Sequence, residues 1–371
     1  MSIIRVASLT LDLLDYAGTS APDTNVALSP LSIASALAVT GHAAKGPTGQ
    51  EFDRLLGLPI QENPRAAARA LVTGTARDAG TGAVLLRNAL WLPASLPVNP
   101  WFAPGPFEAR LALLPRDAQQ AAAAINAWIA EVTRGAIREI VTTPLDTGGF
   151  IVTSAAYFKG KWRHPFAAAA TRLEDFQARG GTPCKVPMMH QTDIAAAYWS
   201  RGDLEAIRLP FLGGPCHPEY VIVTSRSRAP AEEIVEFIRE RTLAEELSSG
   251  SGFELRCGTI AIPRHRVEFA TELSPALSQL GLRTAFSAAA DFTALTPAPL
   301  FLQAVRHRAL LVVDEAGAEA AGGTAALICA GLGPPKPLPP LNFIADRPFV
   351  SLLVAWDAPQ WPVMVALVRS P

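Results

Sequence analysis

The chain has 371 residues, a formal net charge of −1, 49% hydrophobic residues and 18% charged residues. This length and apolar content suffice for a large core, while the near-zero net charge argues against nucleic acids and anionic membrane surfaces as partners. The four cysteines show no CxxC or CxxH spacing, so we expect free thiols and no metal site.

The amino-terminal stretch mixes apolar residues with spaced charges, which predicts an amphipathic helix over residues 2–17, closed by Gly18. It lacks a basic leader followed by a continuous apolar core and a small-residue cleavage site, so it is not a signal peptide. No run in the sequence reaches the roughly 18 apolar residues that span a membrane. We therefore expect a soluble, cytoplasmic protein, with an extracellular location left open.

A short strand at residues 25–28 is expected to lead into an apolar helix at 30–42. Ser29 can cap that helix, and Pro30 takes its first position, where a missing N–H costs nothing. We find no internal repeat and no clear linker, so the chain is expected to form one domain over residues 1–371. The other expected helices are 64–76, 117–134, 231–247 and 274–280, and the other expected strands are 84–92, 150–158, 204–211, 220–224, 260–264, 309–313, 349–356 and 363–368.

An unusual segment, residues 314–332, follows the expected strand at 309–313. From Ala316 onward it is nearly all Ala and Gly, and it is too long for an ordinary connection. Read with a period of two, its small residues share one face of a strand, which predicts a loop able to enter between two existing strands. That face comprises Ala318, Ala320, Gly322, Thr324, Ala326 and Ile328. An Ala-rich helix or a flexible linker is the alternative interpretation, although adjacent glycines in the middle disfavour a stable helix.

Several motifs resemble one known family. Residues 315–324 (EAGAEAAGGT) resemble the reactive-loop hinge of serpins, and residues 345–349 (ADRPF) resemble the serpin signature that follows that loop. Residues 25–33 (NVALSPLSI) and 159–162 (KGKW) match the family as well. The chain therefore resembles a serpin, specifically a prokaryotic inhibitory member, over nearly its whole length.

The resemblance implies the serpin fold, which belongs to the α+β class. We expect a large, mostly antiparallel central sheet A, two further sheets and about eight or nine helices. An exposed reactive-centre loop is expected over about residues 315–342.

The six histidines also allow an enzyme hypothesis. Cys329 or a serine, with His307 and Asp314, would act as nucleophile, base and orienting group. However, the sequence contains no G-x-S-x-G elbow, Walker loop or HExxH motif. We therefore expect no catalytic residues, no enzymatic activity and no cofactor.

The resemblance also implies two groups of residues that control the opening of the central sheet. The shutter lies where the strands must part and comprises Ser29, Ser32, Ser154 and His307. Because the family often has Asn at the position of Ser154, we expect a rearranged hydrogen-bond network there. The breach lies at the upper opening of the sheet and comprises Trp162, Arg264 and Glu315, the last two forming a charge pair.

The hinge is expected to be the part of the loop that enters the sheet, and its residues are small or acidic. They are Glu315, Gly317, Ala318, Glu319, Ala320, Ala321, Gly322, Gly323 and Thr324. The family's usual spacing from Glu315 places the reactive bond at Gly331–Leu332, within a window that begins at Ala330.

The function implied by the resemblance is suicide-substrate inhibition of serine proteases. A protease would form an acyl-enzyme with the loop, and the cut hinge would insert into the central sheet before deacylation. The small and apolar residues near the bond suit elastase-, subtilisin- or chymotrypsin-like enzymes. The expected partner is thus a serine protease, held covalently by a monomeric inhibitor. The alternative is a non-inhibitory serpin acting as a chaperone or carrier.

Overall fold

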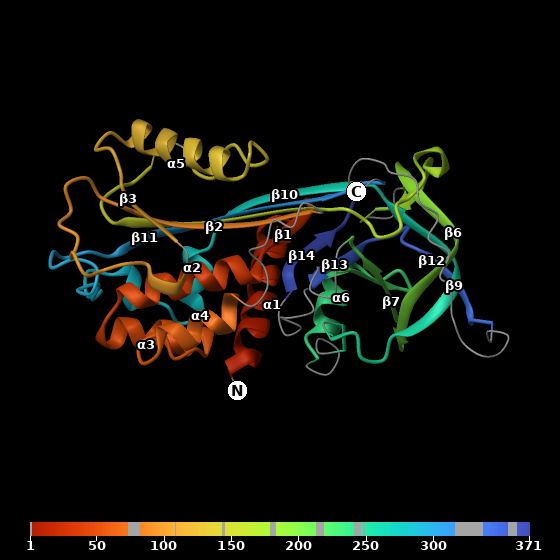
Figure 1. The fold of residues 1–371 in the computed structure, drawn as a ribbon, viewed down its shortest axis with the longest axis horizontal. Helices are drawn as coiled ribbons and strands as arrows, with labels where there is room; N and C mark the ends of the chain where they lie inside the picture. Colours follow the sequence, from red (N-terminus) through yellow and green to blue (C-terminus); the bar gives the residue numbers. More distant parts are fainter. Residues whose placement is uncertain are drawn as a thin grey trace.

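The computed structural model describes residues 2–72, 82–107, 109–142, 145–178, 183–212, 219–240, 246–247, 249–315, 337–354 and 362–371. These residues form helices and two β-sheets (Figure 1). The α-helices are α1 (Ser2–Ser20), α2 (Pro30–Ala43), α3 (Gly46–Leu56), α4 (Pro64–Val72), α5 (Ala118–Val132), α6 (Ala231–Ile238) and α8 (Ser274–Gln279).

The strands come mostly in runs rather than alternating with the helices, as expected for the α+β class. They are β1 (Val26–Leu28), β2 (Gly82–Leu92), β3 (Arg110–Leu113), β4 (Phe150–Gly160), β5 (Arg172–Gln177), β6 (Pro183–Arg201), β7 (Leu204–Pro210), β8 (Glu219–Ser225), β9 (Glu254–Pro263), β10 (His265–Glu272), β11 (Leu302–Val313), β12 (Pro340–Ile344), β13 (Phe349–Val354) and β14 (Pro362–Val368).

The central sheet has five strands in the described part of the chain, in the order β10-β11-β4-β2-β3. β10 pairs with β11 and β4 with β2 in antiparallel orientation. β2 and β3, at one edge of the sheet, are instead parallel neighbours, and so are β11 and β4 in its interior. We call the boundary between β11 and β4 the seam.

The other described strands form one nine-stranded sheet: eight follow the order β1-β14-β13-β8-β7-β6-β9-β12, and the ninth, β5, pairs with β6 beside this path. β6 is 19 residues long and bonds to β5, β7 and β9. The two further sheets expected from the resemblance are thus hydrogen-bonded into one, because this long strand belongs to both of them.

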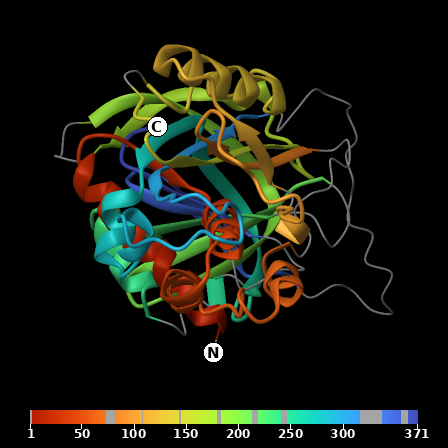
Figure 2. The same cartoon turned by 90° about the vertical axis from the view of Figure 1, so that its left-hand side faces the viewer.

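Helices cover the two faces of the central sheet differently. α5 lies on one face and α2 on the other, as Figures 1 and 2 show. Along β4, Phe150 and Val152 belong to the core that contains α2, whereas Ile151 and Ala155 belong to the core beneath α5. Because both faces of β4 are buried, its sequence is an almost continuous apolar run.

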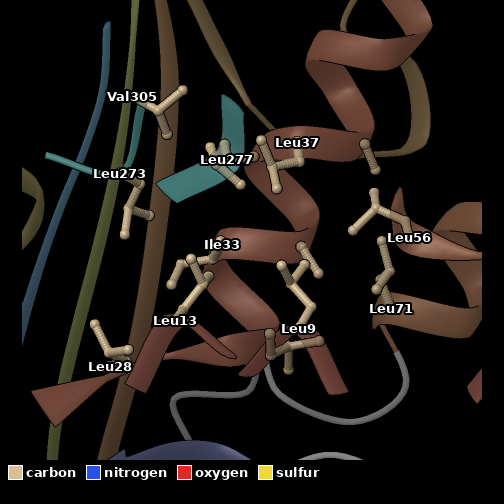
Figure 3. Close-up of a cluster of buried hydrophobic side chains, with 14 of the residues drawn as sticks. Leu9, Leu13, Leu28, Ile33, Leu37, Leu56, Leu71, Leu273, Leu277 and Val305 are labelled. Carbon is tan, nitrogen blue, oxygen red and sulfur yellow. The ribbon is translucent and has the colours of Figure 1, made fainter. Parts of the chain in front are cut away.

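The core on the α2 side brings together segments that are far apart in the sequence. Figure 3 shows Leu13 of α1, Ile33 and Leu37 of α2, Leu277 of α8 and Val305 of β11 in one apolar cluster. α2 is therefore fixed against β11, and its amino terminus is held close to the seam.

Most expected elements are found, and the differences have local causes. Helix α2 begins as predicted, with the Ser32 N–H donating to the Ser29 side chain at 3.3 Å. Gly18 does not end α1, which continues to Ser20. The Arg369 guanidinium donates to the Gly18 carbonyl at 3.1 Å and lies 3.3 Å from the position that a β-carbon would take, so this glycine lets the arginine pack closely.

The predictions for residues 231–247 and for the end of the loop were wrong in extent. α6 ends at Ile238, and the next residue, Arg239, pairs with Asp12 of α1 at 2.7 Å. The loop expected to reach residue 342 gives way to β12 at Pro340, because β12 pairs in parallel with β9. Within the described residues, no helix has the length and apolar character needed to cross a membrane.

Candidate functional site

Among the described strands of the central sheet, two pairs are parallel, β11 with β4 and β2 with β3. Only the first of these, the seam, has an antiparallel neighbour on each side. Its register runs from Leu302 opposite Phe150 to Leu311 opposite Phe158, with one irregularity between Leu302 and Ala304. β11 ends at Val313, and Asp314 and Glu315 follow directly. A segment that turned back from this end would be antiparallel to both central strands. Parallel pairing is also slightly weaker per residue than antiparallel pairing, so the seam is a suitable place for another strand.

The shutter residues meet beneath the middle of the seam. His307 of β11 lies directly opposite Ser154 of β4. The Ser29 backbone N–H donates to Nε2 of His307 at 3.1 Å. Since Nε2 accepts this bond, the ring proton lies on Nδ1, which donates to Ser154 Oγ at 3.1 Å. The histidine thus links both sides of the seam to the cap of α2.

The hydrogen-bond chain continues across the sheet. Ser154 Oγ donates to Ser32 Oγ at 2.9 Å, and Ser32 Oγ donates to Oδ1 of Asn88 on β2 at 3.1 Å. Ser29 Oγ donates to the Val363 carbonyl of β14 at 2.6 Å. Ser154 therefore bridges His307 and Ser32. Asn88 was not included in the predicted shutter, although an Asn inside an apolar strand was a usable signal.

Burial keeps the shutter neutral. His307, Ser29, Ser32 and Ser154 have no exposed surface. Removal from water lowers the pKa of His307 to about 3. The ring is therefore uncharged near neutral pH, as required for Nε2 to accept the Ser29 N–H.

The breach lies at the end of the seam where β11 passes into Glu315. The indole N–H of Trp162 donates to the Asp314 carbonyl at 2.8 Å. The Glu315 carboxylate accepts from Arg264 and, at 2.7 Å, from the Thr171 hydroxyl. The structure thus brings the three predicted breach residues to the base of the loop, together with Thr171, which sequence reasoning missed.

The breach is charged and partly open to solvent, unlike the shutter. Burial by itself would raise the pKa of Glu315, but hydrogen bonds from Arg264 and Thr171 outweigh it and leave the pKa below its usual value. Arg264 is 49% exposed along its side chain, so water and salt weaken this ion pair. Lys159 adds a second ion pair at the same place, 3.2 Å from Asp314.

An aromatic cluster connects the breach to the interior. The Trp162 ring is stacked on Phe211, with centroids 4.3 Å apart, and also contacts Tyr220. The Tyr220 hydroxyl and Nε2 of His265 are 2.8 Å apart, and Nδ1 of His265 lies 2.8 Å from the Pro263 carbonyl. Burial lowers the pKa of His265 to about 4. This histidine directly follows Arg264, and none of the motifs used above singles it out.

The remaining predicted site residues lie outside the described residues. These are the hinge from Gly317 to Thr324, the window from Ala330 to Leu332, and Cys329. Cys184 and Cys257 are described and are free thiols. Among the described residues, no three His, Cys, Asp or Glu side chains come close enough together to hold a metal ion. The described geometry therefore gathers two polar groups of side chains along the seam, one buried beneath its middle and one at the end where Glu315 lies.

Comparisons with known proteins place this geometry in context. A family model described as "Serpin (serine protease inhibitor)" matches residues 5–370. The chain is 31% identical to an uncharacterized serpin-like protein, TK1782, of Thermococcus kodakarensis, over 93% of this chain and 80% of that protein. It is 30% identical to Serpin-ZXA of Oryza sativa subsp. japonica, over 89% of this chain and 86% of that protein.

Solved structures show the same fold at lower sequence identity. Uncleaved ovalbumin superposes with a TM-score of 0.85 and 21% identity, covering 100% of this chain and 99% of that one. Native protease nexin-1 with heparin superposes with a TM-score of 0.84 and 21% identity, at the same coverage.

Proposed function

The chain belongs to the serpin family, and from this premise we propose that it is a suicide-substrate inhibitor of serine proteases. The observation that carries the proposal is the seam, a parallel pair of central strands that leads at its end into a loop of small residues. Such a loop can add an antiparallel strand between β11 and β4. We further infer that the inhibitor acts as a cytoplasmic monomer and needs no cofactor.

The proposed reaction begins as ordinary proteolysis. The serine hydroxyl of the protease attacks the carbonyl carbon of Gly331, and the amide bond to Leu332 breaks. The amine of Leu332 leaves with the proton that the protease histidine took from the serine. Residue 331 then carries an ester to the protease, and the loop is free at that end.

Insertion of the cut loop supplies the driving force. A strand of about 14 residues at ~3.3 Å each would carry the protease roughly 45 Å. Ten to fifteen new backbone hydrogen bonds, each worth about 1 kcal/mol net, supply on the order of 10 kcal/mol. Pulling on the acyl-enzyme can distort its oxyanion hole, where losing one donor slows catalysis by about 10²–10³-fold. The uncut inhibitor is then held in its state by a kinetic barrier.

The test is incubation with elastase, chymotrypsin and subtilisin in turn. We expect an SDS-stable complex with at least one of them, and mass spectrometry should place the cut within the window from Ala330 to Leu332. Loop-cut protein should melt roughly 20 °C or more above uncut protein, because the added strand stabilises it. Cleavage with no complex and no gain in heat resistance would instead favour a chaperone or carrier.

A single substitution in the hinge isolates the insertion step. Ala320→Arg places an unpaired charge on the face expected to enter the sheet, which costs several kcal/mol. We expect this variant to be cut as a plain substrate with no lasting complex. Ala321→Arg is the matched control because its side chain lies on the opposite face of the same strand. An undiminished complex with Ala320→Arg would contradict the insertion mechanism.

A further inference from the structure

Two large apolar side chains are exposed on neighbouring segments, β9 and the residues just before β12. Leu255 of β9 is 48% exposed, and Leu338, which precedes β12, is 40% exposed. In the parallel pair of β9 with β12, Cys257 lies opposite Pro340. Because each leucine precedes its paired residue by two positions, the register carries both to the same end of the strand pair. Most soluble proteins cover such adjacent leucines unless a partner does so.

Neighbouring residues extend this exposed surface across three strands. Ala197 and Ala195 of β6 lie opposite Leu255 and Cys257, and both are at least partly exposed. β6, β9 and β12 lie side by side at the right-hand end of the molecule in Figure 1. We name this face the sheet-end surface and define it as Ala195, Ala197, Leu255, Cys257, Leu338 and Pro340.

Other exposed apolar residues do not share this arrangement. Leu113, 52% exposed, lies on β3 at the opposite end of the long axis in Figure 1. Single exposed leucines of that kind are ordinary in soluble proteins. Contiguous apolar residues on three adjacent strands more often mark a binding surface.

The position of the surface along the chain indicates which partner covers it. Leu338 follows Leu332 by only six positions, which at no more than about 3.5 Å per residue limits their separation to about 20 Å. A stable protein complex covers about 800 Å² on each partner, which is more than a short loop segment alone provides. A protease bound at residues 331 and 332 is therefore within reach of the region beside Leu338.

We propose that the sheet-end surface is a second docking surface for the serine protease that attacks the loop. The surface would suit a protease whose active-site cleft has an apolar rim. That rim would lie on the side of the cleft that binds the residues following the cut bond. Pro339 and Pro340 lack the N–H groups for strand addition at this edge, so recognition uses side chains. The inference rests on the proposed inhibitory function, and it adds a residue, Leu255, that lies outside the loop.

The decisive variant is Leu255→Ser, because Leu255 is remote in sequence from the cut bond and carries no charge. We expect the second-order rate constant of complex formation with the inhibited protease to fall about 10-fold, equivalent to about 1.4 kcal/mol. The stoichiometry of inhibition and the SDS stability of the complex should not change, since insertion is untouched. Leu338→Ser should act in the same direction. Leu113→Ser is the matched control and should react like wild type.

Each outcome separates this proposal from the proposed function. If wild type forms the complex and Leu255→Ser reacts as fast as Leu113→Ser, the docking surface is refuted while inhibition stands. If wild type forms no complex with any of the three proteases, both proposals fail. The surface could instead be occupied by a second copy of this chain, and size-exclusion chromatography tests that alternative. If wild type is a dimer that Leu255→Ser dissociates, the surface binds a second copy and the protease assignment is wrong.

Discussion

The shutter and the breach lie along the same seam but hold it in different ways. The shutter is neutral, has no exposed surface at His307, and joins α2 to three strands through successive hydrogen bonds. The breach is a partly exposed set of ion pairs and one indole bond at the end of the seam. A buried polar group left unpaired costs far more than a screened surface ion pair. Under the proposed mechanism, we therefore expect the seam to part first at the end next to Glu315.

The strongest test of this comparison removes the shutter histidine. His307→Ala leaves the buried Ser29 N–H and the Ser154 hydroxyl without their partner. We expect the free energy of unfolding to fall by about 2–5 kcal/mol, since each unpaired buried group costs roughly 1–3 kcal/mol. Urea unfolding of the uncut protein measures the change.

A conservative variant separates hydrogen bonding from packing at the same position. His307→Gln keeps one amide donor and one carbonyl acceptor, so it should recover part of the loss. If Gln and Ala destabilised equally, the hydrogen-bond chain would not be the source of the stability. If neither variant lost more than about 1 kcal/mol, the contrast between the two regions would disappear.

The next largest expected effect is a loss of folding stability at acidic pH. The pKa of His265 is lowered to about 4 and that of His307 to about 3, whereas an unfolded histidine titrates near 6.5. The unfolded chain thus takes up these protons first, so stability is complete above about pH 6.5 and falls as the pH decreases toward the folded values. At pH 4.5 the lowered pKa of each histidine should have reduced the free energy of unfolding by about 2–3 kcal/mol relative to neutral pH.

The control for acid sensitivity is a variant that cannot titrate. His265→Gln retains an acceptor for the Tyr220 hydroxyl, so its stability should depend less steeply on pH between 6.5 and 4.5. The breach carboxylate does not interfere in this range, because the pKa of Glu315 is lowered and its contribution is lost only at more acidic pH. An unchanged pH slope in this variant would show that His265 is not the group responsible.

The sequence predicted elements best where one local cause dominated. β4 was visible as an apolar run because both of its faces are buried, and the start of α2 was visible from its cap. α3 was missed, because its only fully buried large side chains are Phe52 and Leu56. β6 was missed as a 19-residue strand, because its burial pattern changes where it passes from one part of the sheet to the other.

The site was predicted through family motifs more than through residue chemistry. Ser29 and His307 are 278 positions apart, so no local pattern reveals their hydrogen bond. Asn88 and Thr171 complete the two networks but belong to no motif that the sequence analysis used. The pairing of Tyr220 with His265 depends on how the two sheets pack, which periodicity does not specify.

A smaller effect is expected from the indole bond at the breach. Trp162→Phe keeps a ring against Phe211 but removes the donor to the Asp314 carbonyl. We expect a loss of about 1–2 kcal/mol, combining one hydrogen bond with a small cavity. Trp199→Phe is a matched control, because it loses an indole bond to Glu246 away from the seam. Both variants should unfold more easily than wild type. A synthetic peptide of residues 315–328 should insert into the central sheet as an added strand, and we expect the rate of this annealing to rise only in Trp162→Phe. Equal annealing rates would remove Trp162 from the control of opening.

The smallest change in stability is expected from Arg264→Ala. Because half of this side chain is exposed, its ion pair with Glu315 should contribute less than about 1 kcal/mol to unfolding. The rate of peptide annealing should nevertheless rise, since the pair closes the end of the seam. At 1 M salt the screening length is about 3 Å, so wild type should approach the rate of the variant.

Arg266→Ala is the control, because Arg266 is similarly exposed and pairs only with Glu268 among the described ion pairs. If Arg266→Ala and Arg264→Ala annealed the peptide equally fast, general surface charge would explain the effect, and the breach would have no separate role.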